Sequence, residues 1–252
     1  MKYLVGDIGN TLTKFSLLNG SFQIIKSYNI ETIKLYNKKN SQMFLKKFSL
    51  PEINKKVLFS SVVPSIYKII KLNLKKKKIE TIELKDLNIS KIIKFNIKNL
   101  NQLGSDRISN AIGAYTNYKN NCLVVDFGTA TTFDIVKKPG IYDGGVIAPG
   151  IKLSIINLKK STALLPMLSL KNIAKPFGKN TKEALNSGFL WGYQGLINNI
   201  IKKITLSSKK KYKIILTGGY SNIFRRHISY KSIIDENITI KGIIKVYKDL
   251  LK

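Results

Sequence analysis

The chain has 252 residues, 44% of them hydrophobic and 10% aromatic, which is enough to bury a core and excludes global disorder. It contains no apolar run of about 18 residues, and the N-terminal stretch MKYLVGDIG does not have the features of a secretory signal. Cys122 is the only cysteine, which excludes a disulfide within the chain and a cysteine-based zinc site. We therefore expect a soluble, cytoplasmic protein without a membrane segment.

The formal net charge of +30 arises from 44 basic and 14 acidic residues, and such a charge suggests nucleic acid as a partner. Arginine, however, occurs only at Arg107, Arg225 and Arg226, and the remaining basic residues are lysines. Nucleic-acid surfaces favour arginine for its bidentate contacts, whereas abundant Lys, Ile and Asn are typical of an AT-rich genome. The run LKKKKIE at 74–80 indicates a solvated face. We expect no sequence-specific nucleic-acid binding.

The first half of the chain is rich in predicted strands. Strands are expected at 3–5, 14–18 and 22–28, separated by the turn signals DIGNT and NGS. The following elements are a helical stretch at 32–48, a buried strand in KKVLFSSVVPS that ends before Pro64, a helix from about Ser65, a short strand in IETIEL, and an amphipathic helix in SDRISNAIGAYTNYK.

The same order of elements then starts again. Residues 121–150 predict strand, turn, strand, turn and strand, and IKLSIINLKKSTALL at 151–165 predicts a helix. A long helix is expected at 181–204, then a buried strand that ends in Gly218–Gly219, and short helices close the chain. The pattern indicates two α/β halves, 1–119 and 120–252.

Two short stretches, one in each half, are alike. VGDIGNTLTKFSL at 5–17 and LVVDFGTATTFDIV at 123–136 are apolar strands interrupted by Asp-x-Gly and small polar residues. Glycine lets backbone amides approach a phosphate, and a carboxylate such as Asp7 is able to hold Mg²⁺ directly or through water. One copy is also ordinary hairpin chemistry. Two copies favour a pair of phosphate clamps, with polar groups from Asn10, Thr11, Thr13, Thr129, Thr131 and Thr132.

Two helix starts carry further candidate residues. In LGSDRISNA, Asp106 is either an N-terminal cap or a functional acid, and the retained Arg107 suggests a guanidinium bound to an anionic group. In GKNTKEALNSG, a cap at Asn180 or Thr181 and a ligand contact are equally good interpretations. The sole histidine, His227, is expected at the surface.

The ordered motifs DIGNT, SSVVPS, LGSDR, VVDFGTATTFD, GGVIAPG, STALLP, GKNTKEALNSG and TGGYS resemble those of the type III pantothenate kinases, over essentially the whole chain. This family belongs to the acetate and sugar kinase/Hsc70/actin superfamily. The resemblance implies an α/β chain of two ribonuclease H-like lobes, the actin-like ATPase fold, with the active site in the cleft between them. It also implies a cytoplasmic homodimer that phosphorylates pantothenate with ATP, in the first step of coenzyme A synthesis.

The resemblance further implies roles for individual residues. Asp106 would be the general base, Asp126 would bind a monovalent cation, K⁺ or NH₄⁺, and Asp7 would hold the Mg²⁺ that accompanies ATP. The expected ATP-binding residues are Asp7, Ile8, Gly9, Asn10, Thr11, Leu12, Thr13, Lys14 and Thr129, and the expected pantothenate-binding residues are Gly104, Ser105, Asp106, Arg107 and Thr181. The chain departs from the family where Ile97 and Leu100 stand in place of a Tyr and a Pro.

Two alternatives remain open at this point. One is another small-molecule kinase of the same superfamily, although the LGSDR and GKNT pair argues against it. The other is a non-catalytic regulator with the same fold, which the basic charge favours. The presence of Asp7, Asp106 and Asp126 favours the enzyme.

Overall fold

The computed structural model describes residues 1–48 and 50–252, and contacts divide the chain into two units. The first unit comprises residues 1–119, 139–143 and 237–252, and the second comprises residues 120–138 and 144–236. Each unit has its own hydrophobic core and is described by itself.

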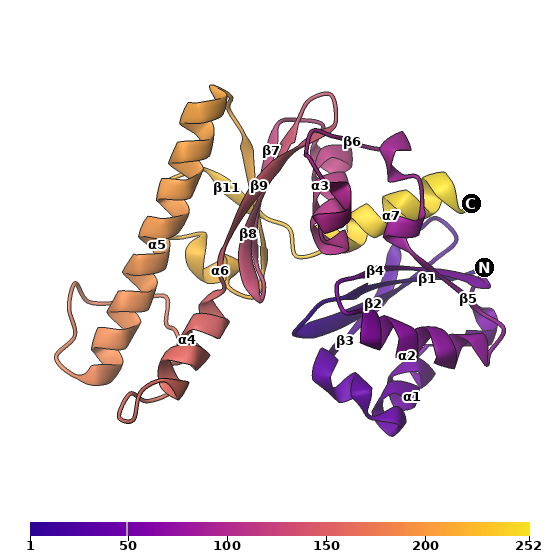
Figure 1. Ribbon diagram of the computed structural model, residues 1–252, viewed down its shortest axis with the longest axis horizontal. Helices are drawn as coiled ribbons and strands as arrows, with labels where there is room; N and C mark the ends of the chain where they lie inside the picture. Colours follow the sequence, from indigo (N-terminus) through magenta and orange to yellow (C-terminus); the bar gives the residue numbers. More distant parts are fainter. Residues whose placement is uncertain (49) are drawn as a thin grey trace. The chain divides into compact units, whose positions relative to one another are not determined.

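The first unit is built on a sheet with the strand order β3-β2-β1-β4-β5. β2 is antiparallel to β1 and to β3, whereas β4 runs parallel to β1 and to β5. Helices α1 and α2 lie on one face of this sheet, and α3 and α7 lie on the other (Figure 1). The elements are β1 (Tyr3–Ile8), β2 (Leu12–Leu18), β3 (Ile24–Glu31), α1 (Lys38–Lys46), β4 (Lys56–Ser61), α2 (Pro64–Lys75), β5 (Glu80–Glu83), α3 (Ser105–Tyr118) and α7 (Ile238–Leu250).

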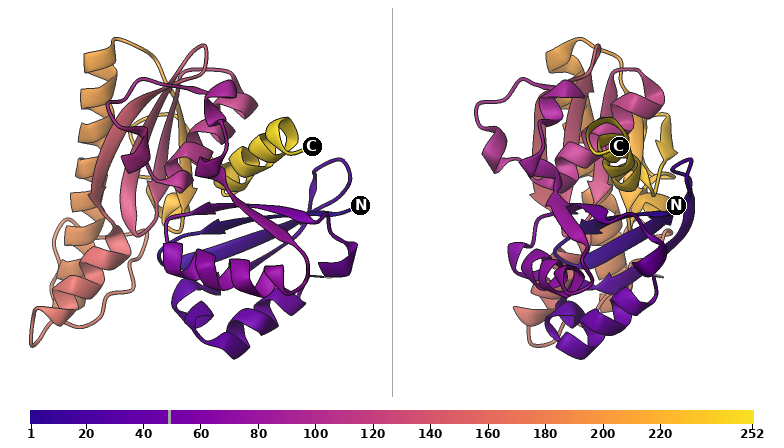
Figure 2. Two further views of the ribbon diagram at one scale, coloured as in Figure 1. Left: turned by 45° about the vertical axis from the view of Figure 1, so that its right-hand side comes forward. Right: turned by 90° about the vertical axis from the view of Figure 1, so that its right-hand side faces the viewer.

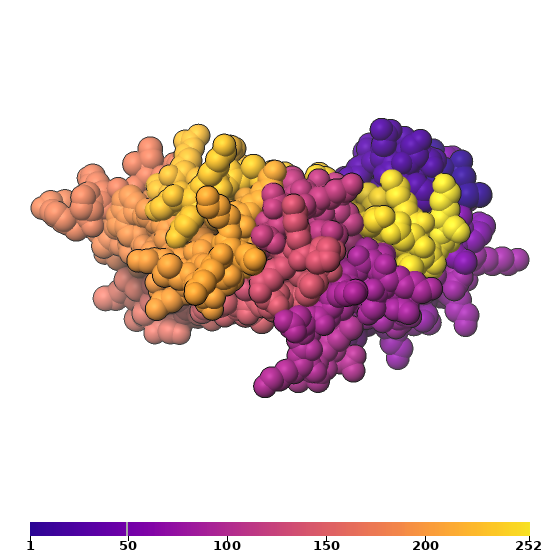
Figure 3. Space-filling view, turned by 90° about the horizontal axis from the view of Figure 1, so that it is seen from above, coloured from indigo at the N-terminus to yellow at the C-terminus, as the bar shows by residue number. Residues whose placement is uncertain are grey.

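Helix α3 is held in place by a close crossing with α7. Each helix has a glycine at the crossing, Gly113 in α3 and Gly242 in α7. A Cβ at Gly113 would collide with the Ile238 carbonyl, and a Cβ at Gly242 would collide with the Ser109 carbonyl. In the space-filling view, α7 (yellow) also lies against the N-terminal residues drawn in indigo (Figure 3), where the rings of Phe22 and Tyr247 are 5.7 Å apart. The C-terminal helix α7 therefore packs against α3 and fixes its position on the first sheet.

The second unit contains most of a sheet with the strand order β11-β10-β7-β8-β9-β6. β6, and the start of β9 with which it pairs, fall in the first unit. α5 packs on the sheet of the second unit through an apolar stripe that includes Leu190, Ile197 and Ile201 (Figure 2). The elements are β6 (Lys94–Phe95), β7 (Cys122–Phe127), β8 (Ala130–Lys137), β9 (Ile141–Pro149), α4 (Ile151–Lys160), α5 (Thr181–Ser208), β10 (Lys213–Gly218), α6 (Ser221–Phe224) and β11 (Ser232–Ile234).

Several predicted boundaries were wrong. β1 continues to Ile8, so Gly6 and Asp7 lie in the strand and not in a turn. The reason is that β1 lies between β2 and β4 and pairs with both of them as far as Ile8. The helix expected at 32–48 is a 3₁₀ helix, Thr32–Tyr36, followed by α1.

The end of the chain also differs from the prediction of short helices. α7 has 13 residues, and its buried isoleucines and valine pack on α3 and the first sheet. Burial of side chains of this size contributes roughly 1.5–3 kcal/mol each, which favours a long helix over a frayed end. Among residues 1–48 and 50–252, no helix is long and apolar enough to span a membrane.

Candidate active site

The first hairpin is a tight turn between β1 and β2. The Gly9 amide donates to the Leu12 carbonyl at 3.1 Å, and Asn10 and Thr11 are exposed at the tip. Thr32 braces the turn from the side, because its hydroxyl donates to the Gly9 carbonyl at 2.7 Å and its amide donates to the Thr11 carbonyl at 3.0 Å. Thr13 is fully buried and its hydroxyl bonds to that of Thr32 at 3.0 Å. The side chain of Thr13 therefore holds the turn, while the tip presents polar groups outward.

Asp7 and Lys14 are directly opposite each other across the first hairpin. Both side chains are half-buried. The Lys14 ammonium donates to the Asn237 amide oxygen at 2.6 Å, and Asn237 precedes α7. A carboxylate and an ammonium at one strand end suit a site for a phosphate chain and its Mg²⁺.

The start of α3 lies at the carboxyl ends of β1 and β4. The Val62 amide, just after β4, donates to the Ile8 carbonyl at 3.0 Å. The Ser105 hydroxyl, in the first turn of α3, donates to the Ser61 carbonyl at 2.9 Å. The structure thus brings residues 7–14 and 104–107 to one edge of one sheet. Ligands of α/β proteins bind at this kind of edge.

Asp106 is a half-buried acid in the first turn of α3. Burial raises the pKa of its carboxyl above the ordinary value, and the backbone amide and charge of Arg107 act against that rise. The Arg107 amide donates to Asp106 Oδ1 at 2.7 Å. A Cβ at Gly104 would collide with that same oxygen, so a glycine at this position leaves space for the carboxylate. This geometry gives a fixed carboxylate that is more basic than usual.

The second hairpin, between β7 and β8, belongs to the second unit. Gly128 and Thr129 are exposed at its tip, and Asp126 is half-buried near the end of β7. A Cβ at Gly150 would collide with the Thr129 carbonyl, so a glycine is needed directly behind the tip. The backbone of Gly150 therefore packs directly against the backbone of this turn.

Gly218, at the end of β10, lies beside Asp126. Its φ is +83°, and a Cβ there would lie 2.7 Å from Asp126 Oδ1. The next amide, that of Gly219, donates to the Phe127 carbonyl at 3.2 Å. The TGGY stretch and the second hairpin, far apart in the sequence, thus form one surface within the second unit.

The strand opposite Asp126 carries two side chains with oxygen atoms. Thr132 is opposite Asp126 in the β-ladder, and Asp134 follows two residues later on the same face of β8. Hydroxyl and carboxylate oxygens suit a hard monovalent cation such as K⁺. Among the residues described, no group of three or more His, Cys, Asp or Glu side chains comes together. Mg²⁺ at Asp7 would accordingly depend on phosphate and water for its other ligands.

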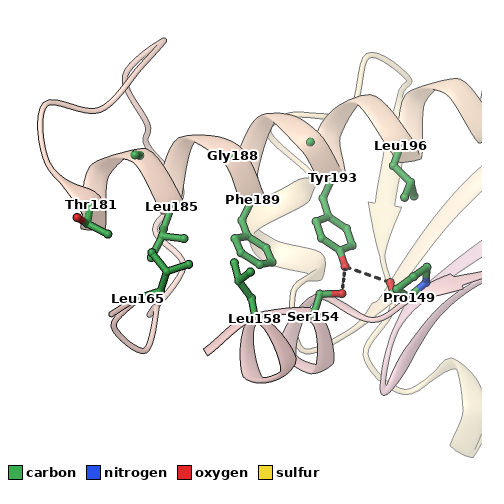
Figure 4. Close-up of a pocket in the computed structure, with 12 residues that line it drawn as sticks. Pro149, Ser154, Leu158, Leu165, Thr181, Leu185, Gly188, Phe189, Tyr193 and Leu196 are labelled. Carbon is green, nitrogen blue, oxygen red and sulfur yellow. Dashed lines mark hydrogen bonds between the residues drawn. The ribbon is translucent and has the colours of Figure 1, made fainter. Parts of the chain in front are cut away.

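Thr181 is the first residue of α5, and Asn180 is the cap, because its side chain accepts from the Glu183 amide at 3.0 Å. Thr181 lies at one end of a groove of about 520 Å³ between α5 and the α4 region (Figure 4). The Tyr193 hydroxyl closes the other part of the groove by bonding to Ser154 at 2.6 Å. Most of the lining is apolar, including Leu158, Leu165, Leu185, Phe189 and Leu196.

Comparison with known proteins bears on what these sites do. The family model of type III pantothenate kinases matches residues 3–203. A type III pantothenate kinase from Pelagibacter ubique is 44% identical over 96% of this chain and 97% of its own length. One from Persephonella marina is 36% identical over 96% of each chain.

The chain belongs to the type III pantothenate kinase family.

Solved structures agree with this family's fold. A protein from Campylobacter jejuni described as a Baf family transcriptional activator has a TM-score of 0.63 at 22% identity, with 98% of each chain covered. A Sinorhizobium meliloti protein described as a 2-dehydro-3-deoxygalactonokinase has a TM-score of 0.60 at 7% identity, with coverage of 98% and 96%. Such low identities bear on the fold alone, and they confirm the predicted α/β, actin-like ATPase class.

Three residues of the pantothenate kinase site were missed by sequence reasoning. Glu83 contacts the start of α3, Thr32 braces the first hairpin, and Asn237 holds Lys14. Each is far in sequence from the residue that it supports, and none belongs to a motif. The one signal available was an acid, Glu83, in the short strand predicted in IETIEL.

Proposed function

We propose that Asp106 is the general base of the reaction that this chain, as a type III pantothenate kinase, carries out. The enzyme transfers a phosphoryl group from ATP to pantothenate and yields 4′-phosphopantothenate, the first step of coenzyme A biosynthesis. The observation that carries the assignment is the half-buried Asp106 carboxylate at the start of α3, whose pKa is raised by burial. A raised pKa makes the carboxylate a better acceptor for the proton of a primary hydroxyl.

Phosphoryl transfer has a loose transition state, so positioning and charge stabilisation provide most of the catalysis. We assign the ATP phosphates to the stretch that comprises Asp7, Ile8, Gly9, Asn10, Thr11, Leu12, Thr13 and Lys14, with Thr129 contributing from the second hairpin. Within this stretch the buried Thr13 would support the turn and not contact the phosphates. Mg²⁺ bound through Asp7 would supply positive charge to the β- and γ-phosphate oxygens. The Thr32 brace supports this role, because it keeps the backbone of the turn in one conformation before ATP binds.

The pantothenate contacts are assigned to Gly104, Ser105, Asp106, Arg107 and Thr181. The guanidinium of Arg107 suits a carboxylate group of the substrate. The Ser105 side chain is 1% exposed and bonds within the protein, so its contribution to the substrate would come through the backbone.

A monovalent cation, K⁺ or NH₄⁺, is proposed at Asp126. The hydroxyl of Thr132, which is opposite Asp126 in the ladder, offers an oxygen ligand and supports this assignment. Bound there, the cation would supply positive charge to a part of the site that is poor in arginine.

Three further properties complete the proposal. The protein acts in the cytoplasm. Its two ribonuclease H-like lobes follow the division of the sequence into 1–119 and 120–252, except that residues 139–143 and 237–252 pack with the first unit. It works as a homodimer, which the apolar groove along α5 supports, since Gly188 and Gly192 leave open space on that helix. Sedimentation velocity tests the dimer, and Leu185→Asp in the groove should shift the protein to a monomer.

The experiment that tests the function is turnover of purified protein with ATP, Mg²⁺ and pantothenate, with and without K⁺. Formation of 4′-phosphopantothenate that requires both substrates is the expected result. Absence of product in K⁺ and in NH₄⁺ would contradict the proposal.

A further inference from the structure

Glu83 is a partly buried acid at the end of β5 that joins three elements of the first unit. Its Oε2 accepts from the Lys85 amide at 2.6 Å, in the 3₁₀ helix Leu84–Asp86. Its Oε1 accepts from the Ser61 amide at 3.3 Å, at the end of β4, and lies 2.7 Å from the Ser105 hydroxyl, in the first turn of α3. Glu83 therefore holds the start of α3 to the ends of two strands.

Three donors converge on the Glu83 carboxyl. They are the Ser105 hydroxyl at 2.7 Å and the backbone amides of Ser61 and Lys85. The Ser105 hydroxyl has a second acceptor within reach, the Ser61 carbonyl at 2.9 Å. Ser105 is therefore held between the end of β4 and the Glu83 carboxyl.

Burial raises the pKa of the Glu83 carboxyl, and the negative charge of Asp86 adds to the rise, while the bonds from Ser105, Lys85 and Ser61 oppose it. The nearby ammonium of Lys85 is directed elsewhere, since it donates to the Asn101 carbonyl at 2.8 Å. On α2, Tyr67 donates its hydroxyl to the Thr81 carbonyl at 3.3 Å.

The first turn of α3 needs this external support. Its cap is Gly104, which has no side chain to bond the exposed amides, and a side chain there would collide with the Asp106 carboxylate. Ser105 is the only residue between that cap and Asp106, and its hydroxyl is the group that Glu83 contacts. Movement of Ser105 would displace Asp106 directly.

We propose that Glu83 is a positioning residue that fixes Asp106 through Ser105. The inference rests on the proposed role of Asp106 as the base. A displacement of about 1 Å at a reacting group is able to cost up to about 10²-fold in rate. The effect falls on the chemical step and leaves substrate affinity nearly unchanged.

The test is a double-mutant cycle on Glu83 and Ser105 with steady-state kinetics. Glu83→Ala and Ser105→Ala should each lower kcat about tenfold and leave KM for pantothenate within about twofold. Because the two residues act as one unit, the double variant should lose no more than the worse single variant.

Tyr67→Phe is the matched control, since it removes one hydrogen bond to β5 and leaves the Glu83 contacts in place. Its kcat should be unchanged. The inference is overturned if the double variant loses kcat by the product of the two single losses. It is also overturned if Ser105→Ala has an unchanged kcat, and this second test remains valid even if Glu83→Ala does not fold.

Asp106→Asn separates this inference from the function on which it rests. Full turnover in Asp106→Asn removes the base assignment whatever the cycle shows. An inactive Asp106→Asn together with a fully active Glu83→Ala overturns the positioning role alone.

Discussion

The two hairpins β1–β2 and β7–β8 carry nearly the same sequence signature but are supported in different ways. The first is braced by side-chain hydroxyls, since Thr32 bonds to Gly9 and to Thr13. The second is backed by glycine backbone, since Gly150 and Gly218 leave room for the Thr129 carbonyl and for Asp126. One local pattern is therefore compatible with two kinds of tertiary support.

The residues opposite the two acids also differ. Lys14 is opposite Asp7, whereas Thr132 is opposite Asp126. A lysine adds positive charge for phosphates, and a neutral hydroxyl leaves oxygen ligands for a cation. The difference supports the proposal that the first hairpin binds the triphosphate and the second a monovalent ion.

The largest effect is expected next to the first hairpin, at Asp106. Asp106→Asn keeps the shape and the bond from the Arg107 amide but cannot take the proton of the hydroxyl. Turnover should fall by about 10²- to 10⁴-fold. Near-normal turnover would make Asp106 a structural cap and would place the base elsewhere.

The stability of Asp106→Asn provides a second readout. Because burial raises the pKa of Asp106 in the folded state, the folded protein binds more protons than the unfolded chain just above the ordinary carboxyl pKa, and stability falls as pH rises through that window. The uncharged Asn removes this loss, so the thermal midpoint at neutral pH should not decrease. A clear decrease would mean that the charge stabilises the fold.

The next largest effect is expected from a side chain behind the second hairpin. Gly150→Ala places a Cβ on the Thr129 carbonyl, which should cost on the order of 1–3 kcal/mol and lower turnover by displacing the tip. The matched control is Gly195→Ala on α5, where nothing lies within 4 Å, and the midpoint should rise slightly. Equal behaviour of the two variants would remove the distinction between the hairpins.

The cation preference sharpens the comparison further. Exchange of K⁺ for Na⁺ should lower activity by about fivefold or more. About fivefold is the low end of the energetic coupling that is typical between two ligand sites, here those of the cation and of ATP. Asp126→Ala should abolish the difference between the two salts, whereas Thr32→Val at the first hairpin should retain it. Identical wild-type rates in the two salts would contradict the assignment.

The smallest effect is expected from the hydroxyl brace. Thr32→Val keeps the side-chain volume but removes the hydrogen bonds to Gly9 and Thr13. The variant should lose about 1–2 kcal/mol of folding stability. Its KM for ATP should rise about two- to threefold. Ser27→Ala is the control, because it removes one hydroxyl bond to Ser16 elsewhere in the same sheet. An equal rise of KM in both variants would mean that the brace has no specific role.

The sequence by itself determined the elements that depend on local pattern. Apolar runs predicted β4, β7 and β10, amphipathic spacing predicted α3, and the ordered motifs predicted the family and the actin-like class. These signals are local, since each depends on residues close together in the chain. They failed at β1, where pairing on both sides extends the strand through Asp7.

Only the tertiary structure decided how the candidate site is held. Glu83 meets Ser105 across 22 residues, and Lys14 meets Asn237 across 223. The requirement for glycine at positions 150 and 218 follows only from the close approach of the second hairpin to these residues. Such contacts have no signature in one sequence, because many residue pairs are able to make a hydrogen bond or leave a gap, and only packing selects which of them meet.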